Sequence, residues 1–99
     1  MASILNISAY KFVELPDASD LRQTLLDRSQ SLQLKGTVLL APEGINLFLA
    51  GSAEAVRQWL DALRQDARFA DLSPKESWSD HQPFKRMLVK VKNEIIRMN

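Results

Sequence analysis

The chain has 99 residues, 45% of them hydrophobic, and a formal net charge of +1 at pH 7. This length suits one small domain, 1–99, with a single core, and it excludes a second domain. The chain contains no cysteine, which excludes disulfide bonds, thiolate metal sites and a cysteine nucleophile within it.

The amino-terminal segment does not have the pattern of a targeting sequence. No basic residue precedes Lys11, and Ser3, Asn6 and Ser8 interrupt the apolar residues, whereas a signal peptide has a basic start and a continuous apolar stretch. No apolar run approaches the length that a membrane-spanning helix needs. We therefore expect a soluble cytoplasmic protein with no membrane partner.

The first two elements in chain order are a strand and a helix. Residues that favour strands are scattered from Ile4 to Glu14, before Pro16, which predicts the strand. Asp17 and Ser19 are candidate caps for the helix that follows. Its apolar face would consist of Leu21, Leu25, Leu26 and Leu32. Its solvent face would carry Arg22, Asp27, Arg28 and Gln30.

The segment Lys35–Gly51 predicts a β-hairpin. A short apolar run, 37–40, is broken by Pro42 and Gly44, residues that favour tight turns, and apolar residues then resume with a period of two. The apolar residues of the second strand are Ile45, Leu47 and Leu49. We expect Glu43 and Asn46 to be the polar residues at the hairpin tip.

A second helix is predicted after the hairpin. Ser52 is a suitable N-cap, and Glu54 would place a negative charge in the first turn, where it interacts favourably with the helix dipole. The apolar residues at helical spacing are Val56, Trp59, Leu60 and Leu63. We expect Phe69 and Leu72 to fold back as a small lid on the core.

The carboxyl-terminal third predicts two further strands. Lys75–Trp78 indicates a short polar strand, and the segment 79–84 forms a loop. From Met87 to Lys92, apolar residues alternate with largely basic ones, which predicts a last strand with one apolar and one basic face. Glu94–Met98 would be its frayed continuation.

The element order is therefore β-α-β-β-α-β with an additional strand at the end. This order is typical of an α+β, ferredoxin-like (acylphosphatase-like) split βαβ sandwich, in which two helices pack on one face of an antiparallel sheet. No third helix is available for the opposite face. That face must be solvated or must contact a partner.

Catalytic chemistry finds little support in the residues. An acylphosphatase site resembles a phosphate cradle with a glycine-bounded loop and an arginine after the first strand, but here that segment, 14–17, has neither and contains two carboxylates. Asn46 alone cannot carry the reaction. His81 and Asp80 are adjacent in sequence and make a poor metal pair. We assign no catalytic or metal-binding residue and no cofactor to this domain.

Positive charge is concentrated near the carboxyl end. Residues 1–72 carry seven Lys and Arg against nine Asp and Glu, while residues 73–99 carry six against three. The candidate cations are Lys75, Lys85, Arg86, Lys90 and Lys92. They form either a polyanion-binding face or simply a solvated strand and tail.

Aromatic residues are interleaved with these cations. Trp78, His81 and Phe84 could provide stacking surfaces for bases, but in so small a domain we expect Trp78 and Phe84 to be core residues instead. The paired aromatic motifs of an RRM sheet are missing, which excludes that class.

Four segments carry a resemblance to a known family. They read AYKFVEL at 9–15, LKGTVLLAPEGIN at 34–46, AGS at 50–52 and KESWSDHQPFKRMLVKVKNEII at 75–96. Together they resemble the amino-terminal domain of the rhodanese-containing tRNA uridine hydroxylases. The resemblance implies oxygen-dependent 5-hydroxylation of the wobble uridine of tRNA by a longer protein. In that family a carboxyl-terminal rhodanese domain, absent from these 99 residues, carries the active-site cysteine.

The resemblance implies an accessory, substrate-positioning role for this fragment, whose partners would be tRNA and the rhodanese domain. In the first hypothesis, the five cations contact phosphates, and Glu43 and Asn46 contact a base or the partner domain. In the alternative, the domain is a non-catalytic interdomain module whose open sheet face packs on the rhodanese domain without touching RNA. Residues partly buried between domains would then include Leu47, Leu49 and Leu88.

Overall fold

The computed structural model describes residues 2–93 of the chain. They form one five-stranded sheet with two α-helices and a short 3-10 helix. The expected continuation over Glu94–Met98 lies outside the described residues.

The sheet has the strand order β4-β1-β3-β2-β5. Its strands are β1 (Ile4–Phe12), β2 (Lys35–Ala41), β3 (Gly44–Ser52), β4 (Lys75–Ser79) and β5 (Met87–Val91). The first four pair antiparallel, as a ferredoxin-like sandwich requires, but β5 pairs parallel with β2 and makes the sheet mixed. The predicted fold class is confirmed, and the parallel fifth strand is the difference from a purely antiparallel sheet.

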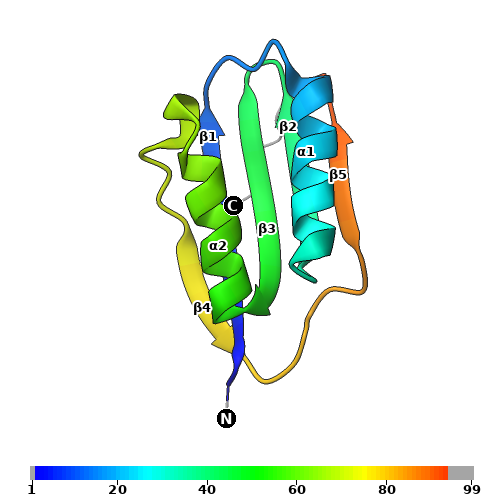
Figure 1. Cartoon of the computed structure of the whole chain (residues 1–99), viewed down its shortest axis with the longest axis vertical. Helices are drawn as coiled ribbons and strands as arrows, with labels where there is room; N and C mark the ends of the chain where they lie inside the picture. The colour runs from blue at the N-terminus through cyan, green and yellow to red at the C-terminus, as the bar shows by residue number, and fades with distance from the viewer. Residues whose placement is uncertain (1, 94–99) are drawn as a thin grey trace.

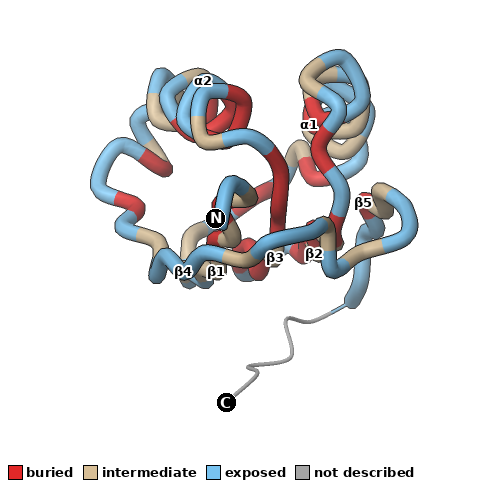
Figure 2. The backbone as a smooth tube through the Cα atoms, turned by 90° about the horizontal axis from the view of Figure 1, so that it is seen from below, coloured by how far each residue is buried: buried red, intermediate tan, exposed pale blue. Residues whose placement is uncertain are grey.

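Both helices, α1 (Ala18–Ser31) and α2 (Ala53–Arg64), lie on one side of the sheet (Figure 1). Seen end-on, the molecule has two layers, and no described element covers the other side of the sheet (Figure 2). The 3-10 helix η1 (Ala67–Phe69) follows α2, and Phe69 and Leu72 are buried, so the predicted lid is confirmed. None of the helices in this part of the chain is long and apolar enough to cross a membrane.

The strand pleat divides each strand between a helix face and an open face. On β3, the core residues Ile45, Leu47 and Leu49 have no solvent exposure, and they alternate with residues that must point to the opposite side. Residues that are directly paired across neighbouring strands lie on the same face, so the strand register assigns residues of every strand to the helix face or the open face. Two rows of the open face are therefore Lys75–Ser8–Phe48–Thr37–Leu88 and Tyr10–Asn46–Leu39–Lys90.

Two predicted caps, Asp17 and Ser52, stand at the helix starts, whereas Ser19 lies inside α1. The Ser52 hydroxyl accepts a hydrogen bond from the Ala55 backbone N–H at 3.2 Å, which caps α2. Asp17 occupies the N-cap position of α1 but makes no side-chain cap, because Arg68 engages its carboxylate instead. Arg22, expected in solvent, is half-buried and donates from Nε to the Val89 carbonyl at 2.8 Å, which ties α1 to β5.

Candidate nucleic-acid interface

One end of the sheet carries a basic depression of about 490 Å³. Lys35 at the start of β2 lines it together with Lys85 and Arg86, which directly precede β5. Gln30, Gln33, Leu34 and Met87 complete the lining. The three cations, here called the basic end, are all exposed, and none forms an ion pair within residues 2–93.

Hydrogen bonds to the backbone carbonyls of Lys85 and Arg86 hold the basic end together. The Gly36 N–H donates to the Arg86 carbonyl at 3.1 Å, and Lys35 Nζ donates to the Lys85 carbonyl at 3.3 Å. Two segments far apart in the chain thus meet because β5 aligns parallel with β2. An open depression with three cations can accept phosphate oxygens, which Lys and Arg bind through charge-assisted hydrogen bonds.

The remaining predicted cations lie elsewhere. Lys75 is on edge strand β4, whereas Lys90 and Lys92 belong to β5 and the residue just after it. The two edges are separated by four strand spacings, roughly 19 Å. The five predicted cations therefore do not form one patch. Lys85 and Arg86 lie together, and Lys75 is far from the β5 lysines.

The predicted hairpin tip needs one correction. Glu43 lies in the exposed turn between β2 and β3, but Asn46 is a β3 residue with 3% exposure. The turn closes at Gly44, so the chain is already paired as a strand at Asn46, opposite Leu39 and Tyr10. Glu43 is at the far end of the sheet from the basic end, roughly 20 Å along β2. One compact site cannot include both.

The open face is hollowed over β4, β1 and β3. Two adjoining hollows of about 240 and 170 Å³ share Ser8, Phe48 and Lys75. The first is also lined by Phe84 and by the polar residues Asn6 and Ser77. The second extends along the sheet to Tyr10, Asn46 and Ser73.

The aromatic expectations were partly wrong. Trp78 is 49% exposed instead of buried. It lies on edge strand β4 and, paired with Leu5 of β1, points to the helix face, but no further strand shields its outer side. Phe84 is half-buried and borders the first hollow. Trp59 is fully buried, as expected for a structural residue.

The segment after β1 does not form a phosphate cradle. The Val13 and Leu15 N–H groups donate to the Glu43 and Pro42 carbonyls, each at 2.9 Å, so these amides are occupied by the hairpin turn. A cradle instead needs backbone N–H groups that point at the anion. Among residues 2–93 there is also no group of three His, Cys, Asp or Glu placed to hold a metal ion.

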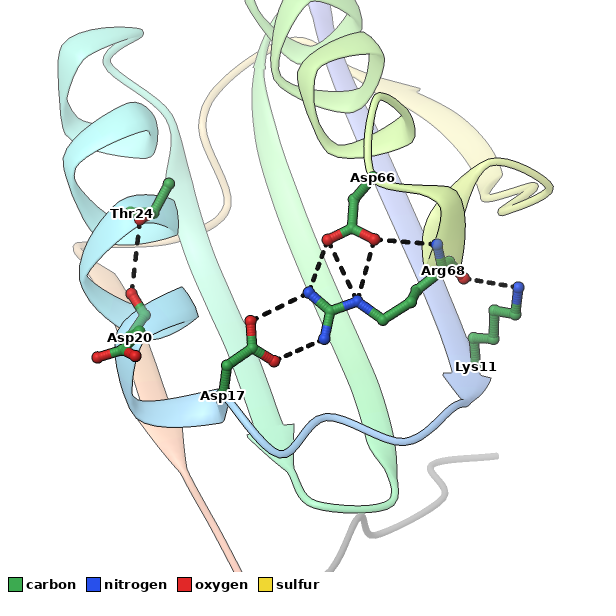
Figure 3. Close-up of polar contacts among 6 residues, drawn as sticks. All are labelled: Lys11, Asp17, Asp20, Thr24, Asp66 and Arg68. Atoms are coloured by element: carbon green, nitrogen blue, oxygen red, sulfur yellow. Dashed lines mark hydrogen bonds and ion pairs between the residues drawn. The ribbon is translucent and has the colours of Figure 1, made fainter.

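An ionic cluster around Arg68 lies on the helix side, away from the open face. Arg68 donates to both Asp17 oxygens, at 2.6 and 3.1 Å, and also binds Asp66 at 2.6 Å (Figure 3). These hydrogen bonds hold the pKa of each carboxyl below its usual range and raise the pKa of Arg68. Lys11 likewise lowers the pKa of Asp71. The cluster joins the start of α1 to η1, which is a structural role.

Several residues of the interface were not predicted. The sequence pattern indicates Lys35 only as the start of the hairpin, and Ser8 and Tyr10 only as parts of the first strand. The period-two pattern contained a usable signal, since assigning Ile45, Leu47 and Leu49 to the core places Asn46 and Phe48 on the open face. The meeting of Lys35 with Lys85 and Arg86 could not be found this way, because it depends on parallel pairing between distant segments.

Comparison with known proteins supports the resemblance. The UPF0176 acylphosphatase like domain model matches residues 4–95. The tRNA uridine(34) hydroxylase of Delftia acidovorans is 68% identical over all 99 residues, which correspond to 38% of that protein. The proteins of that name from Variovorax paradoxus and Ralstonia nicotianae are 64% identical over 99 residues and 66% over 95, covering 38% and 34% of their lengths. The chain thus spans less than half the length of these curated relatives.

Solved structures share the fold. The structure described as BlrP1 BLUF has a TM-score of 0.74 at 15% identity, covering 94% of this chain and 66% of that one. The BLUF protein BlrB has a TM-score of 0.69 at 15% identity, covering 91% and 74%. At these identities the likeness shows the architecture alone. The predicted resemblance to a domain of tRNA uridine hydroxylases is confirmed by the closer relatives, and the chain belongs to the UPF0176 acylphosphatase-like domain family.

Proposed function

We propose that this chain is the accessory, substrate-positioning domain of a tRNA uridine(34) hydroxylase and that its basic end contacts tRNA phosphates. The relatives' name supports the reaction, and the clustering of Lys35, Lys85 and Arg86 around one open depression supports the contact. The role is positioning, because the chain has no cysteine and its described part offers no cluster of metal-ligating side chains.

The basic end suits a phosphate backbone better than a small acidic ligand. Its cations are exposed and line a wide depression, so an extended polyanion can approach without desolvating deeply buried groups. Phosphate contacts of this kind orient a nucleic acid without reading its sequence. The domain would therefore hold the tRNA while another part of the protein performs the chemistry.

The test is the salt dependence of tRNA binding by the 99-residue chain. Replacing Lys85 and Arg86 together by alanine should lower affinity and reduce the slope of log affinity against log salt by about 1.4 to 1.8, since each lost phosphate contact removes about 0.7 to 0.9. Fluorescence anisotropy of a labelled anticodon stem-loop across a KCl series measures both quantities.

A charge-matched control is available on the other side of the molecule. Arg57 is an exposed cation on α2, and Arg57→Ala removes one positive charge far from the open face. Its slope should match that of the unmodified chain, whereas Lys85→Ala alone should reduce it. An unchanged slope in the Lys85→Ala, Arg86→Ala double variant would show that the basic end does not bind RNA.

The interdomain alternative rests on a separate observation. Tyr10 and Phe12, on the open face toward the hairpin turn, are 44% and 57% exposed, with ring centroids 6.1 Å apart at an edge-to-face angle of 82°. Exposed aromatic residues are enriched in protein interfaces. The residues named earlier for this role need correction, because Leu47 and Leu49 are fully buried beneath the helices and only Leu88 lies on the open face.

The two candidates predict different behaviour of Phe12→Ser. If this end of the open face packs on the rest of a longer protein, the substitution should weaken that packing and leave the tRNA salt slope unchanged. The measurement is hydrogen exchange of the β1 amides, compared between the longer protein and the 99-residue chain. Because β1 already pairs with β3 and β4 in the 99-residue chain, its amides should be protected in both proteins but exchange more slowly in the longer one. Equal exchange in both would rule out the packing role.

A further inference from the structure

The hollows on the open face combine three kinds of side chain in one place. Phe48 and Phe84 provide aromatic surface, Ser8 and Asn6 provide hydrogen-bonding groups, and Lys75 provides a positive charge. Glu76 also lines the hollow, but it pairs with the buried residue Ile7, so its side chain leaves β4 on the helix side of the sheet. Phe48 is half-buried at the centre of the sheet, between Ser8 on β1 and Thr37 on β2. Lys75 on β4 pairs with Ser8 on β1. It is exposed and makes no ion pair within the described range 2–93.

Two hydrogen bonds of the Gln82 side chain hold Phe84 beside this hollow. Gln82 donates from Nε2 to the Ala50 carbonyl at 2.9 Å, and its Oε1 accepts from the Phe84 N–H at 3.2 Å. One amide side chain thus anchors the β4–β5 loop to β3 and sets the position of Phe84. The same loop is bound at its start, where Ser79 Oγ donates to the His81 carbonyl at 2.9 Å and accepts from Asn6 Nδ2 at 3.0 Å.

These hydrogen bonds give a role to the segment 79–84, which is not part of the basic end. Ser79 ends β4, and Gln82 and Phe84 lie between β4 and Lys85. None of the three belongs to the hydrophobic core between sheet and helices. Their common effect is to fix an aromatic ring at the rim of a polar hollow. A loop needed only to connect two strands would not require that arrangement.

The lining chemistry points to one class of ligand. An unstacked nucleobase needs an aromatic face, hydrogen-bonding groups for its edge and a cation for its phosphate. Asn6 uses Nδ2 for its bonds to Ser79 Oγ and to the Ile4 and Ser77 carbonyls, which leaves Oδ1 to accept from a base N–H. A purely apolar protein segment would leave Lys75 and the serine hydroxyls without suitable partners.

We propose that this hollow binds one unstacked base of a single-stranded RNA segment, with the base against Phe48 and Phe84 and its phosphate near Lys75. The proposal rests on the proposed function, since it names the part of the RNA that the domain would hold in addition to the backbone at the basic end. Gln82 acts as a positioning residue, because it holds Phe84 and does not itself line the hollow.

The test uses the 99-residue chain with a short single-stranded oligouridine RNA and with the same RNA made abasic at its central positions. Backbone amide NMR shifts report where each ligand binds. The oligouridine should shift the resonances of Ser8, Phe48 and Phe84, and the abasic RNA should shift mainly those around Lys85 and Arg86. Phe84→Ala should weaken oligouridine binding about tenfold with an unchanged salt slope. Lys75→Ala should reduce that slope.

The variants separate the two proposals. Gln82→Ala should weaken oligouridine binding like Phe84→Ala but leave binding of the abasic RNA unchanged. Circular dichroism spectra confirm that each variant is folded. If both ligands shift only the resonances of Lys35, Lys85 and Arg86, the proposed base site is wrong and the proposed phosphate contact at the basic end is supported. If neither RNA binds, both proposals fail. If oligouridine shifts the resonances of the hollow but Phe84→Ala does not weaken oligouridine binding, the base does not stack on Phe84.

Discussion

Ser29 is the residue whose role is hardest to see in the sequence. It lies within α1 and is fully buried, accepting a hydrogen bond from Trp59 Nε1 at 2.8 Å and donating to the Leu25 carbonyl at 2.7 Å. Its hydroxyl therefore connects the two helices through the largest side chain of the core. A buried indole N–H without a partner is costly, and this serine removes that cost.

Replacing Ser29 by alanine should lower the free energy of unfolding by about 1 to 3 kcal/mol, because the buried Trp59 N–H loses its acceptor. Urea denaturation followed by tryptophan fluorescence measures the change. Ser31→Ala is the matched control, since Ser31 is exposed near the end of the same helix and its loss should cost less than about 0.5 kcal/mol. Equal effects of the two substitutions would show that the hydrogen bond does not stabilise the fold.

The burial of a residue could be predicted where the spacing of apolar residues decides it. It could not be predicted where the neighbouring strands decide it. The α2 core residues Val56, Trp59 and Leu60 follow helical spacing, and all three are buried. Trp78 was expected in the core because of its size, but the edge position of β4 leaves it half exposed. Asn46 was expected at a turn because it is polar, yet the turn ends two residues earlier.

At the scale of elements, Gly36 permits the pairing of β2 with β3. Its φ is +139°, and a Cβ added there would lie 2.0 Å from the Phe48 carbonyl oxygen, which is backbone and cannot move aside. Glycine is therefore required for the two strands to approach at this point. The same residue donates its N–H to Arg86, so it also helps to place the basic end.

Gly36→Ala should destabilise the chain by about 3 kcal/mol, through a left-handed φ and a direct backbone clash. Gly51→Ala is the informative comparison, because the Cβ there would meet Leu34 Cδ2, a flexible side-chain end, at 2.4 Å. It should cost clearly less. Thermal unfolding followed by circular dichroism ranks the two variants, and a larger loss for Gly51→Ala would contradict the assigned role of Gly36.

Element types and order could be read from the sequence because each depends on local spacing. The helical period of α2, the alternation in β3 and the turn residues between β2 and β3 are all local signals. No local signal shows that β5 pairs with β2 or that the pairing is parallel, since both depend on the path of the connection 80–86 from β4 to β5. The basic end arises from that pairing, so its three cations could not be grouped in advance.

For the molecule as a whole, the ionic cluster on the helix side links stability to pH. The folded state lowers the pKa of Asp17, Asp66 and Asp71, so these carboxylates favour folding at every pH above their ordinary pKa of about 3.9. As pH falls through the lowered values, they become protonated and the contribution is lost. The urea midpoint should therefore decrease as pH falls from about 5 to about 2.

Arg68→Gln should flatten this dependence, because Asp17 and Asp66 would then titrate nearer their ordinary pKa in the folded state. Arg57→Ala removes an exposed cation from α2 that forms no ion pair with a carboxylate among residues 2–93, so it should leave the pH profile unchanged. A profile in Arg68→Gln identical to that of the unmodified chain would show that the cluster does not contribute.

The short edges of the sheet bear on how the protein behaves at high concentration. β4 and β5 have five residues each, and both carry charged side chains, Lys75 and Glu76 on one and Lys90 on the other. Long, flat, uncharged edges invite strands of other molecules to pair with them, and short charged edges oppose this. The same lysines that are candidates for contact with RNA are therefore placed to discourage edge-to-edge aggregation, and neutral replacements should be checked for solubility as well as for binding.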